Sequence, residues 1–161
     1  PQERDFTTVT DTYNGTIVIG SAGNNLVSGV DYVDVPFVAK PNSFSVQGQL
    51  DATPLSLVAL PDLDFELRDD QGNVLATSGN LGPKEEVGGG LIPGKTYVYR
   101  VVGFANAPTQ FTIKSSQFIN GDAAAGGSSA FLPPTQGVTA TRLVRFTINP
   151  LTRSVTAQVL N

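Results

Sequence analysis

Short segments in which apolar residues alternate with polar ones run through most of this chain, and stretches rich in glycine or proline separate them. The clearest case is residues 62–68, where Leu63, Phe65 and Leu67 alternate with charged residues. Successive side chains of a strand point to opposite faces, so this period of two predicts a strand with one face in a core. A chain made of such segments is constrained to an antiparallel all-β fold whose sheets each bury one face.

The composition agrees with this class of fold. Of the 161 residues, 40% are hydrophobic and only 15% are charged, and the chain has 17 glycines and 11 prolines. Such a mix is typical of a turn-rich β domain, and the length suits one domain with a real core. We expect about nine or ten short strands and no helix, which together predict a β-sandwich.

Changes in composition along the chain divide it into four parts. They are an irregular lead-in over residues 1–15, a β-sandwich over 16–119, a Gly/Ala/Ser/Pro-rich loop or linker over 120–137, and a C-terminal β-hairpin over 138–161. A lone hairpin is marginal in water, so we expect this one to pack on the sandwich or, alternatively, on a neighbouring domain. Because the chain starts at Pro1 without a signal peptide, we expect a mature product or a piece of a longer protein.

Local signals refine the strand assignment. Pro36 cannot donate to a sheet ladder, so residues 31–38 are expected to form an edge strand or to contain a bulge. Residues 69–72, Asp-Asp-Gln-Gly, are typical of a tight turn into a partner strand. Residues 96–103 are apolar on both faces, which predicts a central strand. Residues 78–90, which end in three glycines, are expected to form a long loop.

Two further segments carry weaker patterns. In residues 43–50, Phe44, Val46 and Gly48 alternate with polar residues and are expected to share one face. Residues 55–60 are expected to form one more short strand before Pro61.

Missing residue types exclude several functions. The chain has no cysteine and no histidine, so Ser-His-Asp and Cys-His catalytic arrangements and thiolate or imidazole metal sites are excluded. The net charge is −4, without a block of lysine and arginine, which argues against nucleic-acid binding. Apolar runs are far shorter than the roughly 20 residues of a membrane-spanning helix. Sites for hard cations are built from oxygen ligands, so the missing residue types do not exclude them.

Four segments together resemble a known family. They are residues 31–38 (DYVDVPFV), 43–46 (SFSV), 62–67 (DLDFEL) with Asp69, Gly72-Asn73-Val74-Leu75-Ala76 and Ser78 after it, and 93–101 (PGKTYVYRV). In this order they resemble the bacterial pre-peptidase C-terminal domain. The resemblance implies an antiparallel jelly-roll-like β-sandwich that is appended to secreted peptidases and other exported enzymes. It also implies a non-catalytic accessory role, such as binding a polymeric substrate, and a secreted or cell-surface location. Some relatives bind calcium near strand ends.

The carboxylates of residues 62–70 are the candidate site. Calcium takes six to eight oxygen ligands, with clustered carboxylates preferred, so Asp62 and Asp64 are candidate calcium ligands. Further ligands could come from adjacent segments: Asp31, Asp34, Asp69 or Asp70. The opposing interpretation is a solvated outer strand face whose charges are balanced by Arg68 and Arg100. A third is an acid–base pair for glycoside hydrolysis, because alternate residues on one strand face lie about 6.5–7 Å apart.

These observations leave three hypotheses for function. The first is a non-catalytic accessory or binding domain of a secreted bacterial protein, an exported peptidase or related hydrolase, with calcium as the one candidate cofactor. Its partners would be other domains of a longer exported chain and a polymeric extracellular substrate. The second is a structural or adhesive cell-surface module, and the third is a small carboxylate-dependent hydrolase.

Three aromatic residues need separate interpretation. Tyr97 and Tyr99 could form a stacking surface, but such residues more often fill the core or rim of a sandwich. Phe131 is the one large aromatic residue of the Gly/Ser/Pro-rich segment. It is expected either to anchor that segment in a groove or to contact a partner.

Overall fold

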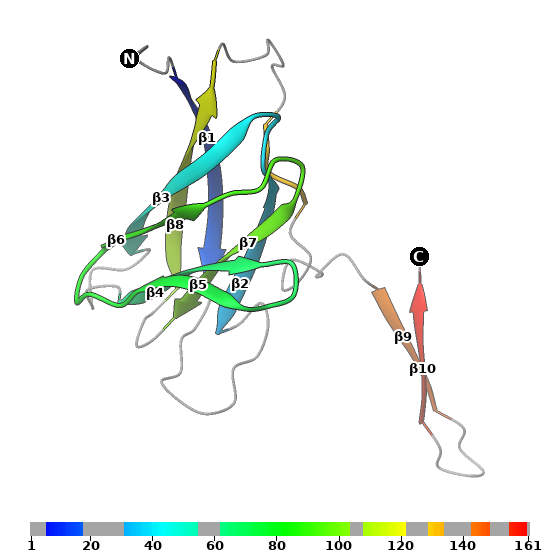
Figure 1. The fold of residues 1–161 in the computed structure, drawn as a ribbon. Helices are drawn as coiled ribbons and strands as arrows, with labels where there is room; N and C mark the ends of the chain where they lie inside the picture. Colours follow the sequence, from blue (N-terminus) through cyan, green and yellow to red (C-terminus); the bar gives the residue numbers. More distant parts are fainter. Residues whose placement is uncertain are drawn as a thin grey trace, which may run out of the picture.

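The structure, a computed structural model, describes residues 6–17, 31–54, 62–103, 108–121, 129–133, 143–148 and 155–160, with the last two ranges and Pro54 described by their backbone. Those ranges contain ten β-strands and no helix. The strands are β1 (Phe6–Ile17), β2 (Tyr32–Val38), β3 (Ser43–Pro54), β4 (Leu63–Asp69), β5 (Val74–Ser78), β6 (Lys84–Gly90), β7 (Thr96–Gly103), β8 (Thr109–Asn120), β9 (Leu143–Ile148) and β10 (Val155–Leu160). They form two four-stranded sheets and one two-stranded sheet (Figure 1), which confirms the predicted all-β sandwich.

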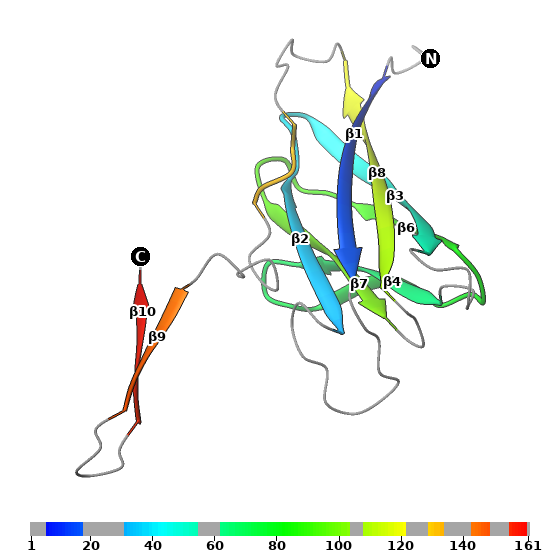
Figure 2. The ribbon, with the colours of Figure 1, turned by 180° about the vertical axis from the view of Figure 1, so that it is seen from behind.

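The strand order is that of a jelly roll. One sheet has the order β1-β8-β3-β6 and the other β2-β7-β4-β5. The first strand therefore pairs with the eighth, the second with the seventh, the third with the sixth and the fourth with the fifth, all antiparallel. This nested pairing describes one long antiparallel ribbon folded over to make two packed sheets, shown from opposite sides in Figures 1 and 2. The predicted jelly-roll-like topology is confirmed.

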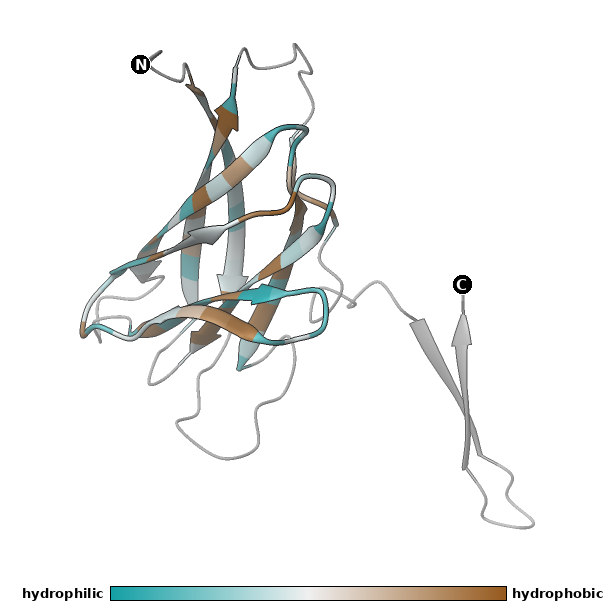
Figure 3. Ribbon diagram, viewed as in Figure 1, coloured by the Kyte–Doolittle hydropathy of each residue, from teal (hydrophilic) through white to brown (hydrophobic). Residues whose placement is uncertain are grey.

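The core fills the space between the two sheets. Leu63, Phe65 and Leu67 of β4 are fully buried, whereas the charged residues between them are partly exposed. On β7, Tyr97, Tyr99 and Val101 point inward, so the prediction that both tyrosines are core residues is confirmed. Figure 3 shows the resulting hydrophobic and hydrophilic bands along the strands.

The local signals at Pro36, in the turn of residues 69–72 and in residues 96–103 are also confirmed. β7 lies between β2 and β4, and β2, which contains Pro36, is an edge strand. The turn between β4 and β5 closes with a 3.2 Å hydrogen bond from the Gly72 amide to the Asp69 carbonyl. Gly72 has a φ of 84°, a left-handed conformation that glycine adopts without steric cost. Residues 55–60 lie outside the described residues, so their predicted strand stays a prediction.

The expectation of an irregular lead-in was wrong for residues 6–15. They belong to β1, which pairs with β8 over its whole length, from Phe6 opposite Asn120 to Ile17 opposite Thr109. The strand is rich in threonine and carries few large apolar residues, so its amphipathic pattern is weak in the sequence. Threonine is β-branched and suits a pleated, half-exposed surface, which explains the strand. Its inward positions as far as Gly15, including Val9 and Tyr13, are half-buried, and Ile17 is fully buried.

The expectation of a loop through residues 78–90 was also wrong for its second half. Residues 84–90 form β6, an edge strand paired with β3, and the three glycines lie opposite Ser45, Val46 and Gln47. A side chain would find little room at two of them. A Cβ at Gly89 would lie 3.2 Å from Leu67, and one at Gly88 would lie 3.1 Å from the Val46 carbonyl. The glycines therefore serve close packing between strands, in place of the expected loop.

Phe44 does not share the inward face of Val46 and Gly48, contrary to expectation. The register between β3 and β8 shifts between Ser43 and Ser45, as in a β-bulge. Ser43 is fully buried, whereas the Phe44 side chain is 42% exposed. A bulge redirects the side chains on either side of it, so the alternation of residues 46–50 does not extend back to Phe44.

Part of the predicted linker adds a short bridge to the sandwich. Phe131 pairs with Phe37 of β2, and its two neighbours make backbone hydrogen bonds to that strand. The Val38 amide donates to the Ala130 carbonyl at 3.0 Å, and the Leu132 amide donates to the Pro36 carbonyl at 2.8 Å. The Phe131 ring packs on the core, so the first of its two interpretations is confirmed. The bridge covers part of an otherwise open sheet edge.

The predicted C-terminal hairpin is confirmed as β9 and β10. The two strands pair antiparallel, with Val155 opposite Ile148 and Val159 opposite Val144, in a sheet separate from the two larger ones. Its docking on the sandwich stays a prediction. Across the described ranges, no helix has the length and apolar character that crossing a membrane requires.

Candidate functional site

The outer face of the β2-β7-β4-β5 sheet carries the carboxylates that the sequence singled out. Asp64 and Glu66 of β4 point away from the core, as the alternation predicts, and Asp62 directly precedes the strand. Glu66 lies opposite Arg100 of β7 in the strand register. This register brings an arginine into the middle of the acidic row.

Arginines neutralise two of the carboxylates on this face. Arg100 donates two hydrogen bonds to Asp34 of β2, from Nε to Oδ1 at 2.7 Å and from an Nη to Oδ2 at 2.8 Å. The Asp34 carboxylate raises the pKa of Arg100, against the lowering effect of burial. The Arg100 guanidinium also stacks 4.1 Å from the centre of the Tyr32 ring. Arg68 pairs with Glu66, with an Nη 2.6 Å from Oε2. The expected charge balance is confirmed for Arg68, whereas Arg100 forms its ion pair with Asp34, outside the row of residues 62–70.

Two more candidate calcium ligands are engaged in the β4–β5 turn. The Asp69 carboxylate accepts hydrogen bonds from the backbone amides of Gln71 and Asn73 and from the Asn73 side chain. These bonds, led by the one from the Asn73 side chain, lower the pKa of Asp69. Asp70 lies 4.0 Å from the Lys95 ammonium group. Asp69 thus makes hydrogen bonds within the turn and Asp70 lies near a lysine, and both are away from Asp62 and Asp64.

Asp64 is a carboxylate of this face whose pKa is raised. Partial burial raises its pKa, and the nearby charges of Asp62, Glu85 and Glu66 raise it further. Gly79 packs beside it, since a Cβ there would lie 3.2 Å from Asp64 Oδ1. Calcium takes six to eight oxygen ligands, and within the described ranges no group of three or more acidic side chains is arranged to hold a metal. The calcium site at Asp62 and Asp64 stays a prediction.

Replacing Asp64 with asparagine tests the cause of this raised pKa. A carboxyl group whose pKa is higher in the folded than in the unfolded state stabilises the fold below the unfolded pKa, and this contribution is lost as the pH rises through the folded pKa. We therefore expect D64N to melt at a higher temperature than the parent at pH 7. The difference should shrink below about pH 4, near the ordinary aspartate pKa. Thermal melts at several pH values measure it, with D70N as the matched control. A melting temperature that falls at pH 7 would contradict the account.

Glu85 is a buried acid that the sequence interpretation missed. It points inward from β6, opposite Leu50 of β3, and its side chain is only 3% exposed. Its Oε2 accepts hydrogen bonds from the Ser78 hydroxyl and from the amide of Asn80 at 3.2 Å. No described group donates to its Oε1. The alternation of Lys84, Glu85, Glu86 and Val87 carried the signal, but the glycines that follow it suggested a loop.

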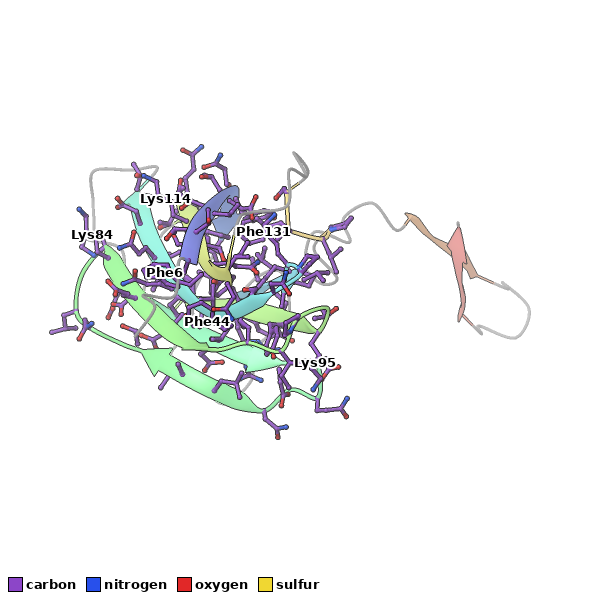
Figure 4. The ribbon with its side chains drawn as sticks, turned by 45° about the horizontal axis from the view of Figure 1, so that its top comes forward. Phe6, Phe44, Lys84, Lys95, Lys114 and Phe131 are labelled. Atoms are coloured by element: carbon purple, nitrogen blue, oxygen red, sulfur yellow. The ribbon has the colours of Figure 1, made fainter. Side chains whose placement is uncertain are left out.

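A groove lies over strands β3, β6 and β8 and reaches Glu85. Its volume is about 690 Å³, within the range of small-ligand pockets. All of the lining residues except Leu50 are polar: Gln49, Leu50, Asp51, Thr53, Asn80, Lys84, Glu85, Glu86, Thr112 and Lys114. Two of these, Lys84 and Lys114, are labelled in Figure 4. Hydroxyl, amide, ammonium and carboxylate groups on these strands can form hydrogen bonds and ion pairs with a polar ligand.

Comparison with known proteins adds distant structural likenesses. No family model and no curated protein sequence matches the chain. A periplasmic inhibitor of g-type lysozyme from Aeromonas hydrophila has a TM-score of 0.41 at 13% identity, over 67% of this chain and 85% of that chain. A Yersinia pseudotuberculosis-derived mitogen has a TM-score of 0.44 at 12% identity, over 80% and 100%. Neither likeness is close enough to bear on function, and the resemblance to the pre-peptidase C-terminal domain stays a prediction.

Proposed function

We propose that this chain is a non-catalytic binding domain of an exported protein, and that it presents a sheet face to a polymeric extracellular ligand. The observation that carries the proposal is the polar outer face of the β1-β8-β3-β6 sheet, with its groove over β3, β6 and β8. The side chains of this face lie on paired strands, and several are already held in place by one another. Thr112, for example, donates to the Asn14 side chain at 2.8 Å across β8 and β1. Such preorganisation lowers the entropy cost of binding.

The state of the carboxylates supports binding over hydrolysis. Glycoside hydrolysis needs one protonated and one ionised carboxyl group in contrasting environments on either side of a substrate. Asp34 and Glu66 are held by arginines, and Asp62 and Asp64 belong to one side of one strand. Calcium remains the candidate cofactor in this proposal, with Asp62 and Asp64 as its ligands.

Sedimentation with insoluble polymers tests the proposed function. The chain is mixed with peptidoglycan, cellulose, chitin or gelatin, and the bound fraction is measured while the supernatant is assayed for released sugars and amino groups. We expect the chain to sediment with at least one polymer and to release no product. Product release that is lost in D62N or D64N would overturn the proposal in favour of a carboxylate-dependent hydrolase. Binding to none of the polymers would overturn it in favour of a structural or adhesive module.

A further inference from the structure

Three phenylalanines from three strands meet on the outer face of the β1-β8-β3-β6 sheet. In this phenylalanine cluster, Phe6 of β1 lies 6.5 Å from Phe44 of β3 and 6.1 Å from Phe118 of β8, between ring centres. Phe44 and Phe118 are 6.4 Å apart. Phe6 is 58% exposed and Phe44 is 42% exposed, and Figure 4 shows both on the same part of the molecule. The cluster thus exposes aromatic surface to solvent at one end of the sheet.

The core does not account for these rings. The buried core between the sheets, and the side chains packed against it, include none of the three. The bulge at Ser43 and Ser45 turns Phe44 outward, although the alternation of β3 would have placed it inside. A local irregularity that re-aims a side chain toward solvent is typical of functional surfaces. Exposed aromatic residues that cluster, unlike single ones, mark interaction sites.

Uncharged polar residues adjoin the cluster on the same face. Phe118 is flanked by Thr8 of β1 and Ser45 of β3 in the strand register. The next outward residue of β8, Ser116, lies between Thr10 and Gln47, and the Ser116 and Thr10 hydroxyls share a 2.8 Å hydrogen bond.

The edge strand and the charged residues complete this arrangement. On β6, Gly90 lies opposite Ser45 and Gly88 lies opposite Gln47, so this edge strand adds no side chain to either row. Charged side chains begin in the third row, with Lys114 of β8 and Glu86 of β6, and Gln47 of the second row donates a hydrogen bond to Glu86. Beside the phenylalanine cluster, the row that contains Phe118 and the next row therefore present hydroxyl, amide and glycine positions without a formal charge.

The aromatic rings and the uncharged polar residues beside them together match the chemistry of a sugar ring. A pyranose has an apolar face of C–H groups, which stacks on aromatic rings, and a rim of hydroxyl groups, which both donate and accept hydrogen bonds. Threonine, serine and glutamine side chains do the same. A membrane surface would instead favour lysine or arginine beside the rings, and the rows next to the cluster contain neither. We propose that this face binds a neutral polysaccharide, with the phenylalanine cluster stacking on its sugar rings. The proposal rests on the proposed function and names its ligand class.

The test compares two double variants with the parent chain. F6A/F44A removes two exposed rings, and L81A/I92A, the matched control, removes two side chains that are 93% and 58% exposed elsewhere. Affinity gel electrophoresis is run with soluble β-glucan, xylan and mannan as neutral probes and with alginate as an acidic one. We expect at least one neutral glycan to retard the parent and the control equally, and F6A/F44A to bind at least tenfold more weakly.

Two measurements separate this proposal from folding defects and from the broader proposal. Because the rings lie outside the core, F6A/F44A should melt within a few degrees of the parent. Retardation by alginate alone, by no glycan, or equally in F6A/F44A and the parent would overturn the assignment of this face to a neutral polysaccharide. If F6A/F44A still sediments with the insoluble polymers as the parent does, the binding domain stands and only the ligand face is wrong.

Discussion

Replacing Gly48 with alanine should lower the free energy of unfolding by about 3 kcal/mol, at the upper end of the cost of overpacking a core. A Cβ at this position would lie 2.5 Å from Tyr99 Cε1 and 2.9 Å from its Cζ, far inside van der Waals contact. The Tyr99 ring has no room to move. It is fully buried, stacks 4.7 Å from Phe37, meets Phe65 edge-on at 5.1 Å, and shares a 2.7 Å hydrogen bond with Ser115.

Urea unfolding of G48A and G90A measures this effect. Gly90 is the matched control, because a Cβ there would meet its nearest neighbour at an ordinary 3.8 Å. A second arm repeats G48A in a Y99L background, where the ring is absent. If the clash is the cause, G48A costs much less in that background, a non-additive result that a double-mutant cycle detects. Equal costs in the two backgrounds would contradict the explanation.

Replacing Phe131 with alanine should cost about 3 kcal/mol, toward the lower end for a phenylalanine truncation because the side chain is only partly buried. Its ring centre lies 5.6 Å from Tyr13, 6.3 Å from Tyr99 and 6.4 Å from Phe37. These partners come from both sheets, β1 in one and β2 and β7 in the other. The ring therefore fills the space where the two sheets meet beside β1 and β2.

The neighbouring L132A is the control for this prediction. Leu132 belongs to the same segment and keeps the same backbone bonds to β2, but its side chain is 38% exposed and lies outside the core. We expect L132A to change the unfolding free energy by about 0.5 kcal/mol or less, as is usual for surface positions. A similar loss in both variants would contradict the assignment of this stabilisation to the Phe131 ring.

Local patterns predicted much of the fold because a strand's faces and its turns depend on nearby residues. The alternation of Leu63, Phe65 and Leu67 correctly assigned the two faces of β4, and the Asp-Asp-Gln-Gly turn was correct for the same reason. The pattern failed where the decisive neighbour is distant in sequence. The glycines of β6 suggest a loop in the sequence, and their strand conformation depends on pairing with β3. The threonines of β1 give only a weak strand pattern in the sequence, because that strand depends on pairing with β8.

In the candidate site, too, the sequence predicted the features that depend on nearby residues and missed those that depend on distant ones. The sequence identified the carboxylates and the two arginines, but pairing Arg100 with Asp34 requires β2 and β7 to be neighbours, although the two residues are 66 positions apart. Glu85 was missed because the glycines after it suggested a loop, and the phenylalanine cluster was missed because its members come from separate strands. No local period indicates that Phe6, Phe44 and Phe118 meet, because the contact depends on register and on a bulge.

The sequence by itself determined the class of this protein: an all-β sandwich without histidine or cysteine chemistry, whose strands each bury one face. Hydrophobic periodicity decides this, because burying alternate side chains is the main source of stability for a sheet. Only the tertiary structure decided which carboxylates are neutralised, where aromatic rings remain exposed, and where a groove lies. Those features depend on long-range strand pairing, because each contact joins residues that are far apart in the sequence.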